Sequence, residues 1–264
     1  MIRRLLLLLA ALPSLAAAQD TAHVKRPPMF TERDAMWASG FVGATLVLTP
    51  FDQRIARWSQ RPALQNDRLL SRTASFFRVT GDPGALIIGG SMYGVGRLLG
   101  LDRLADLGLH GTEAIVVGGI LTGAIKDFAG RARPYAVRDT NAANFQLFRG
   151  LLRGDAYQSF PSGHSLAAFA AASAVTAETS RWWKGSAWVI GPVMYGGATA
   201  VGLSRMYNNK HWASDVILGA GIGTFSGIKV VQFQHSHPGN RLDRWLLRAS
   251  VAPIPHGAAF SIAY

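Results

Sequence analysis

Long apolar stretches separated by short polar segments follow one another from about residue 31 to residue 233. Each stretch is longer than a typical strand, and none shows the two-residue alternation of a half-buried strand, so we predict helices. Glycine and alanine are frequent in them, which lets helix axes approach closely. The sequence therefore predicts an all-α protein with a six-helix core bundle, whose helices cover 31–49, 85–99, 105–126, 165–179, 187–203 and 212–233.

The segment between the first two predicted core helices is rich in arginine. Its apolar residues, such as Leu69 and Phe76, recur at helical spacing, which predicts amphipathic surface helices between core helices 1 and 2. The run 81–84, Gly-Asp-Pro-Gly, is predicted to end them because glycine and proline break helices. The arginines are Arg54, Arg57, Arg61, Arg68, Arg72 and Arg78.

The start of the chain has the features of an export signal. Residues 1–4 carry two arginines, residues 5–12 are apolar, and Ala16–Ala18 offers small residues for cleavage. An uncleaved anchor helix is the alternative, which the short apolar run and Pro13 disfavour. We predict a signal peptide over residues 1–18.

The rest of the chain is predicted to hold one domain. Residues 19–30 are predicted to be extended, residues 31–234 to form the helical domain, and residues 235–264 to form a C-terminal tail. The last seven residues of the tail alternate and are predicted to pair as a strand. The start of the tail is predicted to be a loop, with His235 and His237 solvated.

Charge and cysteine content restrict the function. The net charge of +12 and the pI near 10.8 favour anionic partners, such as phosphate esters, phospholipid head groups or nucleic acid. Export favours lipid or small phosphates, and no run of Lys and Arg interleaved with aromatic residues indicates nucleic acid. Because the chain has no cysteine, thiol catalysis, disulfides and cysteine-ligated zinc are excluded.

A first polar motif follows the third predicted core helix. Lys126 lies at the end of this helix, and Arg133 precedes Pro134, which pushes the arginine out of helical geometry. The two cations can neutralise a phosphate dianion together. Taken alone, a basic helix end favoured by the helix dipole is the simpler explanation.

A second motif, Pro161 to His164, introduces the fourth predicted core helix. Ser162 is predicted to cap this helix, and Gly163 adds no side chain. The free backbone N–H groups of such a helix start favour an anion in front of it. His164 lies at the same place, although by itself it is explained equally well as a hydrogen-bonded interfacial histidine.

A third motif precedes the last predicted core helix. His211 and Asp215 are four residues apart, so both lie on one face if the helix begins at Trp212. An aspartate that accepts a hydrogen bond from one ring nitrogen leaves the lone pair of the other free, as a nucleophilic or metal-binding histidine requires. Arg205 supplies positive charge nearby. The alternative is that these residues only cap and solvate the helix.

Together the three motifs resemble the type 2 phosphatidic acid phosphatase (PAP2) family, which is similar in fold to the vanadium haloperoxidases. The family pattern is Lys, six residues, Arg-Pro; then Pro-Ser-Gly-His; then Ser-Arg, five residues, His, three residues, Asp. The chain matches every specified position and spacing over Lys126–Pro134, Pro161–His164 and Ser204–Asp215. The helix pattern extends the resemblance over about 34–233, apart from the arginine-rich segment.

The resemblance implies a metal-independent phosphatase that has no cofactor and forms a phosphohistidine. His211 would attack phosphorus, Asp215 would orient its ring, and His164 would protonate the leaving alkoxide and later activate water. Fixed positive groups around the phosphate would stabilise the transition state. The phosphate-binding residues that the resemblance implies are Lys126, Arg133, Ser162, Gly163 and Arg205.

Two other functions stay open at this point. A vanadium-dependent haloperoxidase would hold vanadate, which resembles pentacoordinate phosphate, with a similar set of residues, although such enzymes are generally larger. A non-catalytic membrane helix bundle would bind phosphate without needing two histidines and an aspartate. Our leading hypothesis is hydrolysis of a phosphate monoester or pyrophosphate of a lipid, and the sequence does not specify which one.

The predicted helices are borderline in length for membrane spans. Most cover 15 to 20 residues, where a span needs about 20, and one contains His110 and Glu113. Six spans after an exported N-terminus would place the three motifs and the arginine-rich segment on the cytoplasmic side, whereas active sites of the family usually face outward. We expect an exported protein of the cell envelope, membrane-associated or periplasmic, with an outward site.

Overall fold

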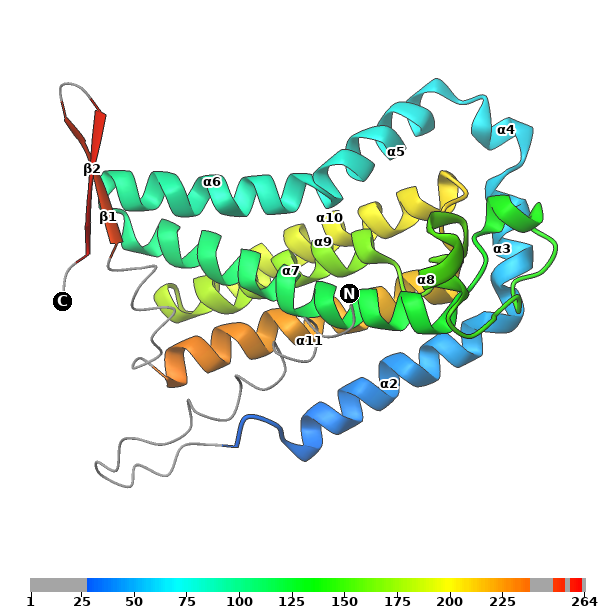
Figure 1. The fold of residues 1–264 in the computed structure, drawn as a ribbon, viewed down its shortest axis with the longest axis horizontal. Coiled ribbons are helices and arrows are strands. Elements are labelled where there is room, and N and C mark those ends of the chain that lie inside the picture. Colours follow the sequence, from blue (N-terminus) through cyan, green and yellow to red (C-terminus); the bar gives the residue numbers. More distant parts are fainter. Residues whose placement is uncertain (1–27, 238–248, 255–256, 263–264) are drawn as a thin grey trace, which may run out of the picture.

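Helices form most of the structure. A computed structural model describes residues 28–237, 249–254 and 257–262. Its six long helices form a bundle, which Figure 1 shows from the side. They are α2 (Glu32–Leu48), α6 (Gly84–Leu99), α7 (Asp102–Ala129), α9 (Gly163–Trp182), α10 (Ala187–Tyr207) and α11 (Ala213–Ser236). The predicted six-helix core is therefore confirmed, with helix ends that differ by only a few residues.

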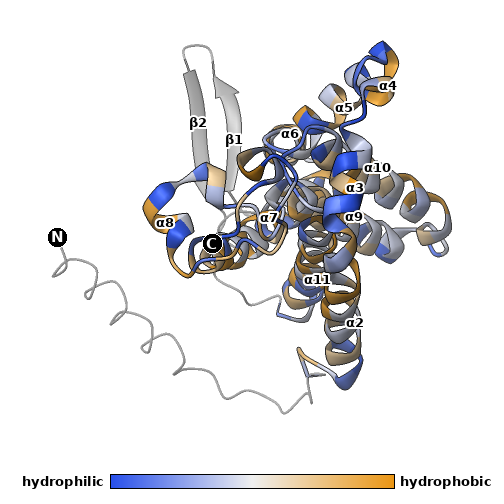
Figure 2. Cartoon of the chain, turned by 90° about the vertical axis from the view of Figure 1, so that its right-hand side faces the viewer, coloured by the Kyte–Doolittle hydropathy of each residue, from blue (hydrophilic) through white to orange (hydrophobic). Residues whose placement is uncertain are grey.

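Shorter helices connect the long ones, and most of them gather at one end of the bundle, on the right of Figure 1. Three of them are the amphipathic helices predicted between core helices 1 and 2, which are thereby confirmed. Figure 2 looks onto this end, where hydrophilic residues (blue) are frequent. The short elements are α3 (Asp52–Ser59), α4 (Pro62–Gln65), α5 (Arg68–Gly81), α8 (Arg149–Arg153) and the 3-10 turns Thr49–Phe51, Pro134–Val137 and Asp155–Tyr157.

Specific residues explain where several helices begin and end. The Asp34 N–H donates to Thr31 Oγ1 at 3.3 Å and the Thr31 N–H donates to the Asp34 carboxylate at 2.7 Å, which forms a capping box. Helices α6 and α7 end at Gly100 and Gly130, both with the positive φ that glycine adopts readily. A Cβ on Gly130 would also lie 2.1 Å from the carbonyl oxygen of Gln146. A residue with a side chain at position 130 would therefore collide with the loop that follows α7.

Helices α9 and α11 pack closely at the centre of the bundle. Glycines of α11 face the backbone of α9 and make this approach possible. A Cβ on Gly223 would lie 2.3 Å from the carbonyl oxygen of Leu166, and a Cβ on Gly219 would lie 2.3 Å from that of Ser162. The small residues of α11 therefore set the position of the N-terminal end of α9.

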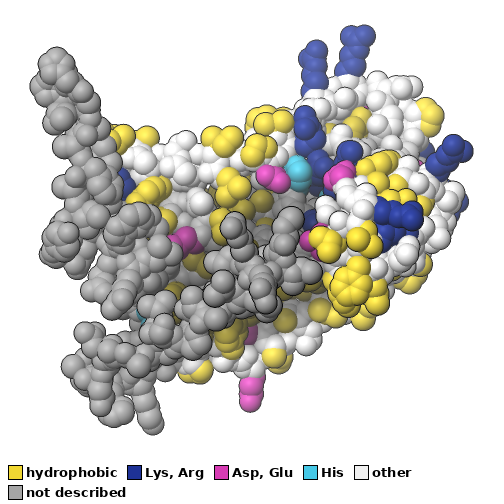
Figure 3. Space-filling model, viewed as in Figure 1, with side chains coloured by type: hydrophobic (Ala, Val, Ile, Leu, Met, Phe, Trp, Pro, Cys, Tyr) yellow, Lys and Arg dark blue, Asp and Glu magenta, His cyan; other side chains and the backbone are white. Residues whose placement is uncertain are grey.

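Apolar side chains also cover much of the outer surface. Large hydrophobic residues are exposed on α2, α7 and α10, for example Trp37, Ile120 and Trp188. Figure 3 shows such side chains (yellow) along the bundle. Within the described residues, two segments, Asp102–Val137 and Ala213–Ser236, are long and apolar enough to cross a membrane by length and composition. The surface of the bundle thus suits an apolar environment.

The C-terminal region differs from the sequence prediction in one respect. Helix α11 extends to Ser236, so His235 lies on its last turn, and the loop predicted to begin at His235 is wrong at this residue. Strands β1 (Ala249–Ile254) and β2 (Gly257–Ile262) pair antiparallel, which confirms the predicted tail strand for most of its length. The predicted signal peptide, residues 1–18, lies outside the described residues.

The contact between α9 and α11 predicts opposite effects for two glycine substitutions. Gly223→Ala should lower Tm because its Cβ would collide with backbone atoms of Leu166 and Ala170, a kind of overpacking that costs about 1–3 kcal/mol. Gly119→Ala is the matched control, because its Cβ would have nothing within 4 Å. Alanine is favoured over glycine in a helix by about 1 kcal/mol, so the control should keep or raise Tm. Equal Tm values for the two variants would contradict this packing.

Candidate active site

The three sequence motifs meet at the end of the bundle where the short helices gather. Arg133 Nη1 lies 3.4 Å from His211 Nε2, and a Cβ on Gly163 would lie 3.8 Å from Cε of Lys126. Figure 3 shows Lys and Arg side chains (dark blue) concentrated at this end. Residues from the end of α7, the start of α9 and the loop between α10 and α11 are therefore brought together, as the family resemblance implied.

His211 is held in one tautomer. Its side chain is buried, with 2% exposed, and its Nδ1 lies 2.7 Å from the carbonyl oxygen of Ser159. Because a carbonyl oxygen only accepts hydrogen bonds, Nδ1 carries the proton and donates it. In the neutral ring Nε2 is then unprotonated, and its lone pair lies on the side of Arg133. This is the form that a histidine nucleophile requires.

Burial also keeps the His211 ring neutral. Removal from water lowers the pKa of His211 to about 3, and the charges of Lys126 and Arg133 act in the same direction, whereas Asp215 opposes them. The ring is therefore unprotonated at Nε2 at neutral pH.

Asp215 orients His211 indirectly. Its Oδ2 lies 3.6 Å from His211 Nδ1, which is too long for a hydrogen bond. Ser159 Oγ donates to this oxygen at 2.5 Å, while the Ser159 carbonyl accepts from the histidine. The Trp212 N–H also donates to Oδ2, at 2.8 Å. The direct aspartate–histidine hydrogen bond predicted from the four-residue spacing is therefore replaced by a connection through Ser159.

A buried arginine connects Asp215 to the start of α3. Arg131 is 1% exposed, and its guanidinium donates to Asp215 Oδ1 and, at 2.7 Å, to Asp52 Oδ2. It also donates to the Ala142 carbonyl, at 2.9 and 2.7 Å, and to Ser214 Oγ at 2.7 Å. The Ser214 N–H and Oγ complete the hydrogen bonding of Asp52, at 2.9 and 2.5 Å. Buried charges need this degree of pairing to be tolerated, so the network fixes the backbone on both sides of His211.

Sequence reasoning assigned no role to Ser159, Arg131 or Asp52. Ser159 and Arg131 lie next to or inside the motifs, so a search for polar residues flanking the motif positions would have found them. Asp52 lies in the arginine-rich segment, which the family resemblance leaves out, and no local pattern marks it. Only the packing of α3 against the start of α11 brings it to the site.

Three cations surround the two histidines. Lys126 Nζ donates to the carbonyl oxygen of Gln158 at 2.7 Å. Arg133 pairs with the exposed carboxylate of Asp155 at 2.6 Å. Arg205 is 4% exposed, and its Nε and Nη1 find no hydrogen-bond acceptor within the described part of the chain. A buried donor without an acceptor is unfavourable, so this guanidinium is suited to receive an anion.

The electrostatics of Arg205 support the same interpretation. Burial, then the charges of Arg133 and Arg78, lower the pKa of Arg205 to about 10. Positive charge is thus concentrated beyond what the surrounding carboxylates offset, which favours binding of a dianion. Arg78 belongs to α5 and was not predicted as a site residue.

His164 lies in the first turn of α9 and is more accessible than His211. Its side chain is 22% exposed, and its Nδ1 lies 3.8 Å from a carboxylate oxygen of Asp82. Burial, followed by the charges of Arg205 and Arg133, lowers the pKa of His164 to about 3. A bound dianion would offset these charges and favour the protonated ring, which a general acid requires.

The helix start at Ser162 and Gly163 is only partly as predicted. Ser162 caps α9, since its Oγ accepts the N–H of Ser165 at 3.4 Å. The N–H of Ser162, however, donates to the Asp215 carbonyl at 2.9 Å, so the phosphate contact predicted for this N–H is not available in the structure. Gly163 is the first residue of α9, where an α-helix leaves its N–H groups without intrahelical acceptors.

The arrangement suits displacement at a phosphate group. A neutral histidine with a defined lone pair lies beside buried cations, and a second histidine lies at the helix start. Buried cations stabilise charge that develops on phosphate oxygens more strongly than water does. The same charges supply what a metal ion often contributes in such reactions.

The part of the chain that carries the three motifs is similar to known proteins. Residues 109–237 match the family model of the PAP2 superfamily. This range contains all three motifs, most of helix α7, and the whole of helices α9, α10 and α11.

Two curated relatives are lipid A 1-phosphatases. That of Porphyromonas gingivalis is 37% identical over 90 residues, which cover 33% of this chain and 19% of the relative. That of Rhizobium johnstonii is 33% identical over 122 residues, which cover 45% of each chain. This chain therefore matches less than half of the length of either relative.

A solved structure shares the fold. It is the crystal structure of a transmembrane PAP2-type phosphatidylglycerolphosphate phosphatase from Bacillus subtilis, with a TM-score of 0.55 and 18% identity. The match covers 78% of this chain and 97% of the other. The six-helix architecture is thus shared well beyond the motifs.

The lowered histidine pKa values predict how stability depends on pH. The unfolded chain takes up protons on His211 and His164 near pH 6.5, whereas the folded protein does so only near pH 3. The free energy of unfolding should therefore fall as the pH drops below about 6.5, by up to about 1.4 kcal/mol per pH unit for each histidine.

Thermal unfolding in phosphate-free buffer between pH 4.5 and 7 tests this prediction. Wild type should lose stability as the pH falls, and His211→Asn should lose markedly less. His237→Asn, which changes a histidine outside the site, should keep the wild-type slope. Equal slopes in all three proteins would show that His211 is not held neutral by the fold.

Proposed function

We propose that this chain, whose residues 109–237 match the PAP2 superfamily model, is a metal-independent phosphatase that acts on a lipid phosphate through a phosphohistidine. The observation that carries the proposal is the environment of His211 Nε2. Because Nδ1 donates to the Ser159 carbonyl, Nε2 carries the free lone pair, and Nε2 lies 3.4 Å from Arg133 Nη1. The buried Arg205 has donors that find no acceptor among the described residues. A phosphate in this space meets a nucleophile and its neutralising charges together.

In the first step, His211 Nε2 attacks phosphorus. An N–P bond forms as the bond between phosphorus and the ester oxygen breaks. The protonated ring of His164 donates its proton to the departing oxygen, so that an alcohol leaves. The proton stays on His211 Nδ1, which continues to donate to the Ser159 carbonyl, and the nearby Asp215 carboxylate balances the positive charge of the phosphorylated ring.

In the second step, His164 acts as a base. It takes a proton from water as the water oxygen attacks phosphorus, and the N–P bond breaks with its electron pair returning to His211. Inorganic phosphate is released and His164 is protonated again. His211 thus acts only as the nucleophile, whereas His164 donates one proton to the leaving group and takes one proton from water in each cycle.

The cations have a fixed role in both steps. Lys126, Arg133 and Arg205 contact the phosphate oxygens, with Gly163 at the helix start contributing its backbone N–H. They hold the oxygens while charge is redistributed in the transition state. We propose that these groups make a catalytic metal unnecessary.

A lipid is the proposed carrier of the phosphate. The two curated relatives are lipid A 1-phosphatases, and the outer surface of the bundle exposes large apolar side chains such as Trp37 and Trp188. A membrane-associated protein meets a lipid phosphate where its head group reaches the end of the bundle, and exposed basic residues such as Arg78 suit an anionic head group there. The proposed location is the cell envelope after export.

Phosphate release by the purified protein tests the substrate class. Lipid A is the first substrate to compare, followed by phosphatidylglycerophosphate, phosphatidic acid and isoprenyl pyrophosphate. Neither relative is a haloperoxidase, and no feature of the site favours that activity over phosphate transfer.

The proposed roles predict different behaviour for the two histidine variants. His211→Ala removes the nucleophile and should abolish the phosphoenzyme with every substrate. His164→Ala removes the general acid, which should cost on the order of 10²- to 10⁴-fold with an alkyl phosphate. With p-nitrophenyl phosphate the loss should be much smaller, because nitrophenolate leaves without a proton.

Burst-phase kinetics of the two variants measure this difference. His164→Ala should release a burst of nitrophenol and then stall, because no base activates water. Equal losses in burst rate for alkyl and nitrophenyl substrates would show that His164 only binds phosphate. A normal burst in His211→Ala would remove the covalent mechanism.

A further inference from the structure

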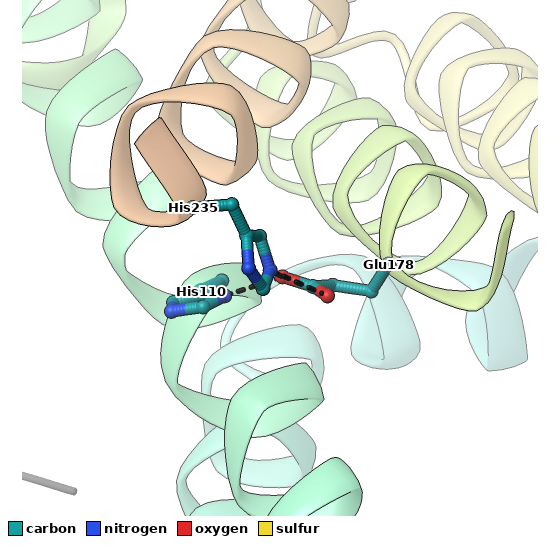
Figure 4. A group of neighbouring side chains, drawn as sticks. All are labelled: His110, Glu178 and His235. Atoms are coloured by element: carbon teal, nitrogen blue, oxygen red, sulfur yellow. Dashed lines mark hydrogen bonds and ion pairs between the residues drawn. The ribbon is translucent and has the colours of Figure 1, made fainter. Parts of the chain in front are cut away.

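A second group of polar residues lies far from the active site. His110 of α7, Glu178 of α9 and His235 of α11 point toward one another, as Figure 4 shows. One potential ligand atom from each residue lies within 4.8 Å of those of the other two. His235 was predicted to be solvated in a loop, and its contact with Glu178 in this group shows that this prediction is wrong.

The group lies at the opposite end of the same three helices that build the active site. Helix α9 carries His164 in its first turn and Glu178 fourteen residues later, about 21 Å along the axis. On α7 the separation between His110 and Lys126 is about 24 Å by the same rise per residue. The active site and this second group are therefore spatially separate.

Glu178 is the centre of the group. Its side chain is fully buried, and His235 Nε2 lies 2.8 Å from its Oε1 and 3.0 Å from its Oε2. His110 Nδ1 is also hydrogen-bonded to Oε1. The two imidazole rings are nearly perpendicular, with centroids 5.4 Å apart. Three side chains from three helices thus direct nitrogen and oxygen atoms at one point.

We propose that His110, Glu178 and His235 form a binding site for a zinc-class divalent ion. Two imidazole nitrogens and a carboxylate are a common donor set for Zn²⁺, with bonds of about 2.0–2.2 Å. Tetrahedral ligands at these lengths lie roughly 3.4 Å apart, so His235 Nε2 and the Glu178 oxygens, now at 2.8 and 3.0 Å, need to separate by only a few tenths of an ångström. The side chain of His110 has to move further from Glu178 than that of His235, and all three ligand atoms already lie within 4.8 Å of one another. The site carries no cysteine, which the chain lacks.

Ion binding replaces the hydrogen bonds that now join the three residues. The protons on His110 Nδ1 and His235 Nε2 move to the other ring nitrogen or to solvent, and the freed lone pairs coordinate the ion. The His235 side chain is 25% exposed, which gives a path for the ion and for a water molecule as fourth ligand. His110 and Glu178 are buried and supply the interior side of the site.

The site is structural in this proposal. A bound ion would link α7, α9 and α11 at a place where no residue takes part in the proposed catalysis. Because it would bind the folded protein and not the unfolded chain, it would stabilise the folded state. Because it lies about 21 Å from His164 along α9, its removal should not change the chemical step. The proposal does not depend on the phosphatase assignment, and either one can fail alone.

Zinc binding to the full-length protein tests the proposal directly. Protein stripped with a chelator and then dialysed should bind one equivalent of Zn²⁺ at this site, and zinc at 100 times Kd should raise Tm by about 5–10 °C. His235→Gln keeps a polar side chain at the partly exposed position and should lose this equivalent and the Tm shift. His237→Gln is the matched control, because His237 lies two residues away and contacts Phe233 and Ser236 instead of the group.

Co²⁺ reports the coordination sphere. Wild type and His237→Gln should show the intense visible absorption of tetrahedral Co²⁺, and His235→Gln should not. Added vanadate, which occupies the phosphate site, should leave the spectrum unchanged. Zinc or cobalt binding that persists in His235→Gln, or no binding by wild type, would overturn the proposal, as would displacement of the ion by vanadate.

Discussion

The buried ion contacts of Arg131 are the interaction on which the active site depends. Its guanidinium bridges Asp52 at the start of α3 and Asp215 at the start of α11, and all three side chains are almost completely removed from water. Breaking such a pair on one side leaves a buried charge, at a typical cost of 3–5 kcal/mol, which the handful of kcal/mol that stabilise a domain cannot easily absorb. Asp215 in turn holds Ser159, and the Ser159 carbonyl sets the tautomer of His211. His211, the proposed nucleophile, is thus oriented by a chain of contacts that begins at Arg131, two residues before the motif arginine, Arg133.

The two ends of the bundle use the same helices differently. At one end, backbone turns and buried charges concentrate positive potential around a neutral histidine, an arrangement that a bound anion would stabilise. Along the middle, glycines such as Gly223 let α9 and α11 approach closely, so the site is built on rigid elements. At the other end, the Glu178 carboxylate is hydrogen-bonded to His110 and His235. This group has no excess of positive charge, so it suits a cation instead of an anion.

Much of this could be predicted from the sequence because helical length, breaks and motif spacing are local properties. The six core helices follow from such patterns, whereas the convergence of Lys126, Arg133, Gly163 and His211 was implied by the family resemblance that their motifs carry. The roles of Ser159 and Asp52 could not be predicted, because a carbonyl oxygen has no sequence signature and Asp52 reaches the site only through tertiary packing. The four-residue spacing of His211 and Asp215 indicated the right pair but the wrong contact. His235 was misjudged because glycine and proline after it resemble a loop, whereas the helix extends to meet Glu178.

The central claim is that His211 Nε2 becomes covalently bound to phosphorus. The most direct measurement uses His164→Ala with ³²P-labelled p-nitrophenyl phosphate, quenched within the burst so that the intermediate has accumulated. The account predicts about one label per protein, stable in alkali, labile in acid, and located by peptide mapping on His211. Label on another residue, or turnover by wild type with no protein-bound label at any quench time, would contradict it.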